Sequence, residues 1–197
     1  MSLANIFTAS RIVLAPFFLI LFFLPEWTGF SPRLSVLILI PLFTFMEFTD
    51  FLDGYFARKT KSVSDFGKLF DPFADVLANI TVLLCFMIAG YLPVLLFIII
   101  LYREMSIMFV RMLASRNGVA IGARKGGKTK TVMYIVAAGF SLAIETAVRF
   151  NIAFPFSIEV LRWINLGLYC LAVLLAIASF IDYLRHFSSV LKTSKKN

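Results

Sequence analysis

Six long apolar segments, separated by short polar stretches, follow one another along the chain. They cover about residues 5–24, 34–57, 71–89, 92–114, 130–148 and 160–184. A helix needs roughly 20 mostly apolar residues to cross a hydrocarbon core about 30 Å thick, and each segment approaches this length. None of the segments alternates strictly between apolar and polar residues, as the strands of a membrane β-barrel do. The pattern therefore predicts an all-α integral membrane protein with six transmembrane helices.

The segments form one unit. The chain has no internal repeat and no low-complexity linker, so we expect a single membrane domain over residues 1–197. Pro25 and Gly90 are expected to end the first and third helices. Arg11 and the apolar run behind it also resemble a secretory signal peptide, but a small-residue cleavage site is missing before Pro25. We therefore expect the first segment to be retained as a membrane span.

Composition supports the membrane assignment. Of 197 residues, 60% are hydrophobic and 15% are charged, and 23 are Phe, whereas soluble domains are about 45–50% apolar and about 25% charged. This excludes a cytosolic enzyme, a disulfide-bonded secreted domain and a disordered tail. Cys85 and Cys170 lie in apolar segments without metal-ligand spacing, and we interpret them as small hydrophobic residues.

The net charge is +8, and the distribution of the basic residues along the chain predicts how the helices are oriented in the membrane. Lys and Arg concentrate in the loops after the second and fourth segments and in the C-terminal tail, and such residues favour the cytoplasmic side. Six spans with both termini in the cytoplasm satisfy this distribution. In a membrane protein a basic surplus also favours contact with anionic lipids, so we predict no nucleic-acid partner.

Four aspartates lie where the second segment ends and the third begins. Asp50 and Asp53 are three residues apart, and Asp71 and Asp75 are four apart, so each pair shares one helix face. The basic loop between the two pairs places both at the cytoplasmic edge. Charged residues within spans are costly and usually functional, although structural ion pairs with nearby Lys and Arg are an alternative interpretation.

Converging carboxylates favour divalent metal ions. Mg²⁺ prefers oxygen ligands that it shares with substrate phosphates, and two metal ions about 4 Å apart can hold a diphosphate during in-line displacement. The small residues Gly54, Ala57 and Gly67 leave room for a ligand, and Arg58 can bind phosphate oxygens. The pattern predicts two Mg²⁺ ions, with Mn²⁺ as an alternative.

Residues 50–75 also carry a family signature. They resemble the pattern D-x-x-D-G-x-x-A-R-x₈-G-x-x-x-D-x-x-x-D of the CDP-alcohol phosphotransferase family at every fixed position. The resemblance implies six transmembrane helices, usually a homodimer, and transfer of a substituted phosphate from a CDP-linked donor to an alcohol with release of CMP. It further implies that Asp50, Asp53 and Asp71 bind one metal ion and that Asp50, Asp71 and Asp75 bind the second. Asp75 is then also the base that accepts the proton of the alcohol. The residues expected to bind the CDP donor are Gly54, Ala57, Arg58, Ser64 and Gly67.

The acceptor has to be chosen by other residues. Arg103, Glu104 and Arg111 form the pattern R-E-x₆-R, and Lys128 and Lys130 lie in the pattern G-K-x-K-T. Both resemble the branch of the family that uses CDP-diacylglycerol as donor and sn-glycerol 3-phosphate as acceptor and forms phosphatidylglycerophosphate. The opening N-x-x-T-x-x-R, which contains Thr8 and Arg11, and the Ser64–Gly67 loop resemble the same branch. Arg103, Arg111, Lys128 and Lys130 are thus candidates for binding the acceptor phosphate.

Several alternatives stay open. Lys128 and Lys130 also fit positive-inside anchoring, and Arg103 also fits a structural ion pair within the membrane. Val76 and Ala4 stand where the branch usually has Lys and Pro, so inositol phosphate, serine or choline remain alternative acceptors. A transporter would also keep carboxylates in its spans, but usually near the midplane and in repeated halves. The single unrepeated cluster at one edge favours an enzyme.

Overall fold

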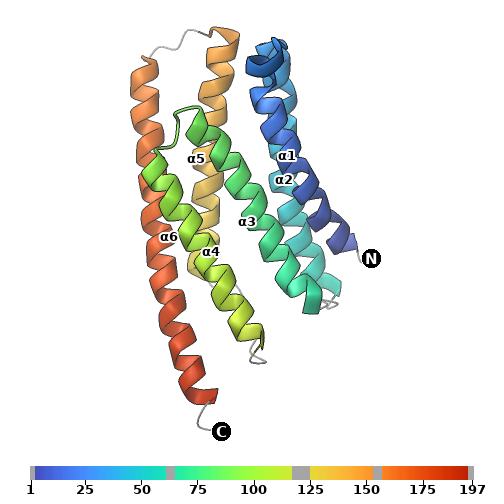
Figure 1. The fold of residues 1–197 in the computed structure, drawn as a ribbon, viewed down its shortest axis with the longest axis vertical. Helices are drawn as coiled ribbons and strands as arrows, with labels where there is room; N and C mark the ends of the chain where they lie inside the picture. The colour runs from blue at the N-terminus through green and yellow to red at the C-terminus, as the bar shows by residue number, and fades with distance from the viewer. Residues whose placement is uncertain (1–2, 61–64, 117–124, 153–156, 195–197) are drawn as a thin grey trace.

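A computed structural model describes the backbone of residues 3–60, 65–116, 125–152 and 157–194. It describes side chains over residues 8–49, 70–114, 129–152 and 157–185. The described residues form six helices and no strand, which confirms the predicted all-α class (Figure 1). These helices are α1 (Leu3–Thr28), α2 (Pro32–Thr60), α3 (Asp65–Ile88), α4 (Val94–Arg116), α5 (Lys125–Phe150) and α6 (Ile158–Ser194).

The helices run alternately up and down as one elongated bundle. The starts of α1, α3 and α5 and the ends of α2, α4 and α6 all lie toward one end, which we call the N-terminal end (Figure 1). The ends of α1, α3 and α5 and the starts of α2, α4 and α6 lie toward the opposite end. This arrangement agrees with the predicted order of six consecutive segments. It also places the signature residues 50–75 at the N-terminal end.

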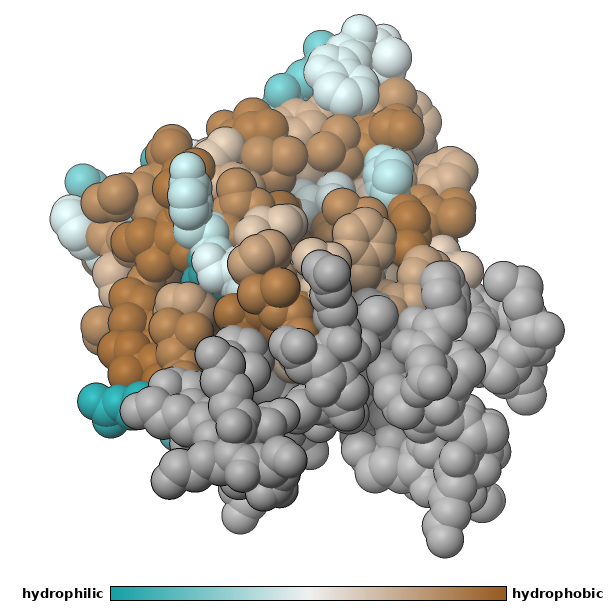
Figure 2. Space-filling model, turned by 60° about the horizontal axis from the view of Figure 1, so that its bottom comes forward, coloured by the Kyte–Doolittle hydropathy of each residue, from teal (hydrophilic) through white to brown (hydrophobic). Residues whose placement is uncertain are grey.

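Within the described residues, five helices are long and apolar enough to cross a membrane. These stretches are Thr8–Thr28, Pro32–Thr49, Phe70–Ile88, Thr129–Phe150 and Ile158–Arg185. The predicted fourth span is a helix too, but Arg103, Glu104 and Arg111 lie within α4. Many large apolar side chains face outward, and Figure 2 shows a mostly brown surface with scattered teal and white residues over the part of the chain that is coloured. The chain is therefore a multi-pass membrane protein.

The first helix does not end at Pro25, contrary to the prediction. It continues to Thr28, and Gly29 ends it with a φ of 74°. Proline inside a helix leaves the carbonyl four residues earlier without its usual donor. Here that carbonyl belongs to Leu21, and the Ser35 hydroxyl of α2 donates a 2.6 Å hydrogen bond to it. A polar side chain from the neighbouring helix thus allows α1 to continue past the proline.

Aromatic side chains fill the core between the first three helices. Phe18, Phe22 and Phe86 are buried, and the ring centroids of Phe22 and Phe86 lie 5.7 Å apart in an edge-to-face arrangement. The α3–α4 connection turns at Gly90, whose φ is 80°. Tyr91 follows it, and its hydroxyl donates to Glu145 on α5 at 2.6 Å. The third helix and its connection are therefore joined to both α1 and α5.

Candidate active site

The first helix contributes two polar side chains to the predicted catalytic aspartates on α3. The Thr8 hydroxyl donates a hydrogen bond to Oδ1 of Asp71 at 2.7 Å. One guanidinium nitrogen of Arg11 donates to Oδ1 of Asp75 and forms an ion pair with it. Because α1 and α3 run in the same direction, both pairs advance together by about one helical turn. The structure thus joins the N-x-x-T-x-x-R opening to the second half of the signature.

These four side chains differ in exposure. Thr8 is fully buried and Arg11 is 3% exposed, whereas the side chain of Asp75 is 36% exposed. A buried cation is costly in an apolar environment unless an anion compensates it, and Asp75 provides that anion. Asp75 is therefore partly accessible from outside the bundle, which is compatible with its predicted role as a base.

The other half of the signature lies outside the described side chains. Asp50, Asp53, Gly54, Ala57 and Arg58 belong to the last part of α2, for which only the backbone is described. The same is true of Gly67 on α3, and Ser64 lies outside the described residues altogether. The end of α2 and the start of α3, which carry the two halves of the signature, both lie toward the N-terminal end (Figure 1). Their predicted roles stay predictions.

The chemistry of the donor set fits a hard divalent cation. Asp71 and Asp75 both provide carboxylate oxygens, the ligands that Mg²⁺ prefers. Among the side chains that the structure describes, no group of three His, Cys, Asp or Glu residues lies together as a metal site. The described side chains therefore include two of the four predicted ligands, Asp71 and Asp75.

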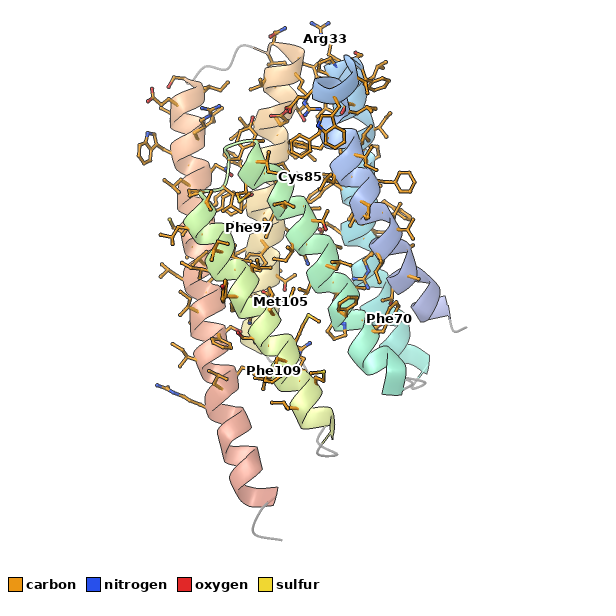
Figure 3. The ribbon with its side chains drawn as sticks, viewed as in Figure 1. Arg33, Phe70, Cys85, Phe97, Met105 and Phe109 are labelled. Atoms are coloured by element: carbon orange, nitrogen blue, oxygen red, sulfur yellow. The ribbon has the colours of Figure 1, made fainter. Side chains whose placement is uncertain are left out.

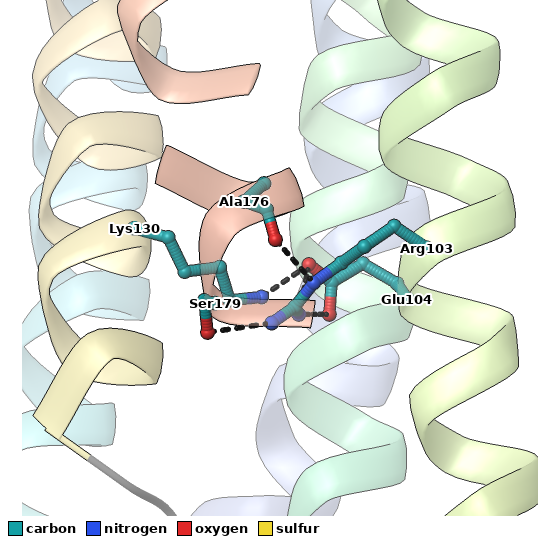
Figure 4. A network of polar contacts seen from close by, with 5 residues as sticks. All are labelled: Arg103, Glu104, Lys130, Ala176 and Ser179. Atoms are coloured by element: carbon teal, nitrogen blue, oxygen red, sulfur yellow. Dashed lines mark hydrogen bonds and ion pairs between the residues drawn. The ribbon is translucent and has the colours of Figure 1, made fainter. Parts of the chain in front are cut away.

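A second polar cluster connects α4, α5 and α6 in the interior (Figure 4). Arg103 donates from one terminal nitrogen to both oxygens of Glu104 at 2.9 Å. Its Nε donates to the carbonyl oxygen of Ala176 at 3.3 Å, and its other terminal nitrogen donates to the Ser179 hydroxyl at 3.2 Å. Lys130 forms an ion pair with the same carboxylate of Glu104. We call Arg103, Glu104 and Lys130 the buried triad.

The buried triad carries more positive than negative charge. Its members are 6%, 5% and 9% exposed, so one carboxylate faces two cations away from water. Lys130 also lies over the ring of Tyr134, 5.0 Å from its centroid. The positive charge of Arg111 repels that of Lys130. The Nε of Arg111 is buried with no hydrogen-bond partner among the described residues. The side chain of Lys128 lies outside the described residues.

Comparison with known proteins identifies the family. A profile of the CDP-alcohol phosphatidyltransferases matches residues 1–178. The chain belongs to this family. A CDP-diacylglycerol–glycerol-3-phosphate 3-phosphatidyltransferase of Treponema pallidum (strain Nichols) is 42% identical over 98% of this chain and 92% of its own length. A protein of the same name from Bacillus subtilis (strain 168) is 30% identical over 98% of this chain and 98% of its own length. The CDP-diacylglycerol–glycerol-3-phosphate 3-phosphatidyltransferase 2 of Arabidopsis thaliana is 31% identical over 96% of this chain and 81% of its own length.

Family membership confirms the resemblance that residues 50–75 indicated. Members of the family are phosphatidyltransferases, so the chain is an enzyme of this class. Sequence reasoning did not assign partners to Thr8 and Arg11. Their spacing of three residues, against four between Asp71 and Asp75, is the signal that two parallel helix faces could meet. Which helices are neighbours could not be obtained from that spacing.

Proposed function

We propose that the protein transfers the phosphatidyl group of CDP-diacylglycerol to sn-glycerol 3-phosphate. The products are CMP and phosphatidylglycerophosphate, and the reaction belongs to phospholipid biosynthesis. The observation that carries this proposal is the 42% identity, over 98% of this chain, to the relative named for that reaction. The complete signature in residues 50–75 supports the same chemistry. So do the contacts of Thr8 with Asp71 and of Arg11 with Asp75.

The proposed reaction begins with Asp75 as the general base. Its partly exposed carboxylate accepts the proton of the acceptor hydroxyl. The hydroxyl oxygen forms a bond to the phosphorus that carries diacylglycerol, the bond from this phosphorus to the bridging oxygen breaks, and its electron pair leaves with CMP. Two Mg²⁺ ions, or Mn²⁺, bound by Asp50, Asp53, Asp71 and Asp75 would acidify the hydroxyl and neutralise the diphosphate.

Binding of the CDP donor is assigned to the signature residues between the aspartates. Arg58 pairs with diphosphate oxygens, and Ser64 donates a hydrogen bond to the donor. Gly54, Ala57 and Gly67 allow the donor to approach the backbone closely, because their side chains occupy little space. The diacylglycerol chains lie in the lipid beside the bundle.

The acceptor phosphate is proposed to bind Arg111, Lys128 and Lys130. The buried Nε of Arg111 has no hydrogen-bond partner among the described residues, and this supports the assignment, because a buried donor is costly until an acceptor reaches it. Each nitrogen group of Arg103 already has a protein partner. Arg103 therefore supports the site through Glu104, which also holds Lys130.

We further propose that the enzyme lies in the cytoplasmic membrane with the active site and both termini on the cytoplasmic side. The basic residues near the N-terminal end support this orientation through the positive-inside rule. Ser31→Cys places a thiol in the α1–α2 turn at the opposite end. In a Cys170→Ser background, which removes the exposed native cysteine, this thiol should react with a membrane-impermeant reagent in intact cells. Labelling only after the cells are broken would contradict this orientation.

A homodimer is proposed through one face of α4. Exposed apolar side chains on this helix recur at alternating steps of three and four residues, the spacing typical of paired helices. These side chains, which we call the α4 stripe, are Leu95, Ile98, Tyr102, Met105, Phe109 and Met112. Figure 3 marks Met105 and Phe109 on this helix.

Crosslinking tests the α4 stripe as a dimer contact. In a Cys170→Ser background, Met105→Cys should form disulfide-linked dimers in membranes under mild oxidation. Ile177→Cys on α6 is the matched control, because the two side chains have similar exposure, 44% and 38%. Equal crosslinking from both positions would contradict the α4 stripe as the interface.

Release of CMP tests the proposed reaction. Purified protein in detergent, supplied with CDP-diacylglycerol and Mg²⁺, should release CMP with sn-glycerol 3-phosphate and not with inositol phosphate, serine or choline. Asp71→Asn should abolish the release, whereas Thr81→Val, six residues beyond Asp75 on the same helix, should preserve it. Release with a different alcohol would replace the acceptor, and no release with any of them would contradict the proposed reaction.

A further inference from the structure

Two buried side chains of the first helix contact the aspartates to which a metal and a base role are assigned. Thr8 and Arg11 reach across from α1 to Asp71 and Asp75 on α3. Neither residue has a role in the reaction as described above. Both are almost completely shielded from solvent, with exposures of 0% and 3%. Their polar groups are therefore directed at other protein groups inside the bundle and not at solvent.

Thr8 differs from five other threonines whose hydrogen bonds the structure describes. A helical threonine ordinarily donates its hydroxyl hydrogen to the carbonyl three or four residues earlier in its own helix. The threonines with such a bond here are Thr28, Thr44, Thr49, Thr81 and Thr146. The Thr8 hydroxyl instead donates to a carboxylate on another helix at 2.7 Å. Hydrogen bonds to charged acceptors of this kind are stronger than those to neutral carbonyls.

Each contact engages one of the two oxygens of a carboxylate. A hydrogen bond to Oδ1 of Asp71 and an ion pair to Oδ1 of Asp75 restrict rotation of both groups about the Cβ–Cγ bond. The direction in which each carboxylate presents its oxygens is then set by α1. Groups that hydrogen-bond metal ligands in this way orient them and commonly change metal affinity.

We propose that Thr8 and Arg11 are positioning residues of the metal site. From α1 they fix the orientation of the Asp71 and Asp75 carboxylates toward the metal ions. This inference rests on the proposed function, because it requires that both aspartates are metal ligands. It adds the first helix to a site whose signature lies entirely on α2, α3 and their connection.

The inference predicts a change in metal affinity before any substrate is present. Thr8→Val keeps the volume and loses the hydroxyl, so the dissociation constant for Mn²⁺ should rise about 10- to 100-fold. Thr8→Ser keeps the hydroxyl and should stay within about threefold of the wild type. Arg11→Lys keeps the charge but replaces the forked guanidinium by one ammonium, so Mn²⁺ should bind about tenfold more weakly.

Electron paramagnetic resonance of free Mn²⁺ measures this binding on the full chain in detergent without substrates. Thr81→Val is the matched control, because its hydroxyl bonds the Leu77 carbonyl of its own helix at 2.8 Å. Asp71→Asn serves as the variant that should lose binding. Far-UV circular dichroism and size-exclusion chromatography establish that each variant is folded, and Arg11→Lys provides a second test if Thr8→Val does not fold.

The possible results separate this inference from the proposed function. Wild-type protein that binds no Mn²⁺ would overturn the metal site and the inference with it. If the wild type binds Mn²⁺ and Asp71→Asn does not, the metal site stands. Folded Thr8→Val and Arg11→Lys with wild-type affinity would then overturn the positioning role alone. Weaker binding by these two variants and unchanged binding by Thr81→Val would support it.

Discussion

Replacing Glu104 by Gln tests how the bundle accommodates charge within the membrane. The Glu104 carboxylate receives both Arg103, at 2.9 Å to each oxygen, and Lys130. Gln is nearly the same size and keeps a hydrogen-bond acceptor, so packing is preserved. The negative charge is lost, and two buried cations remain without an anion. The substitution thus isolates the electrostatic contribution of one carboxylate.

The expected loss of stability is large. Removing one partner of a buried ion pair costs about 3–5 kcal/mol, because the other charge stays buried and uncompensated. For a chain of this length, such a loss lowers Tm by about 6–20 °C. Glu104→Gln combined with Lys130→Met should recover part of the loss, since one rather than two cations then lacks an anion. Glu159→Gln, an exposed residue at the start of α6, should shift Tm by less than about 3 °C.

A buried cysteine provides the assay. Cys85 is fully buried and Cys170 is exposed, so in a Cys170→Ser background a thiol-reactive dye reports opening of the bundle at Cys85. The dye fluorescence is followed during heating of the detergent-solubilised protein. A Glu104→Gln protein that opens within about 2 °C of the wild type would refute the view that Glu104 compensates buried cations here.

Three further predictions follow from individual contacts. Asp75→Asn should abolish CMP release yet leave binding of CDP-diacylglycerol, measured with radiolabelled lipid, within about threefold of the wild type, because it removes the base. Ser35→Ala deprives the Leu21 carbonyl of its donor and Arg149 of an acceptor, and should cost about 1–3 kcal/mol. Thr44→Ala loses only an exposed bond within its own helix and should cost less than about 0.5 kcal/mol, and thermal unfolding compares the two variants. Lys130→Met should raise KM for sn-glycerol 3-phosphate about 10- to 100-fold, without a similar rise for the lipid donor, in steady-state kinetics.

The sequence predicted the helices well because membrane spans leave a strong signal. Uninterrupted apolar runs of about 20 residues have few structural interpretations, and all six predicted segments are helical. Helix ends were less predictable. Pro25 carries the usual signal for a helix end, but the donor that replaces its missing bond comes from Ser35, beyond the turn. A local pattern does not contain this information.

For the candidate site, the sequence likewise indicated individual residues but not their contacts between helices. Asp71 and Asp75 were predicted from their four-residue spacing and from the energetic cost of placing carboxylates at the edge of a membrane span. The partners of these aspartates were not found, because Thr8 lies 63 positions before Asp71 and such contacts depend on which helices pack together. Arg103 illustrates the same limit, since its donors are directed at Ala176 and Ser179 on a helix that the sequence did not place beside α4.

These cross-helix contacts also explain how the bundle selects one arrangement. Apolar surfaces gain little by leaving lipid for one another, so packing and polar contacts decide which helices associate and in which register. Arg11 with Asp75 fixes α1 against α3, and Arg103 with Ser179 fixes α4 against α6. Arg149 of α5 donates to Ser35 of α2 at 2.9 Å. Two of these three contacts involve residues assigned to the reaction or to its support. Substitutions at the candidate site should therefore affect folding as well as turnover, and binding measurements on folded protein are needed to separate the two.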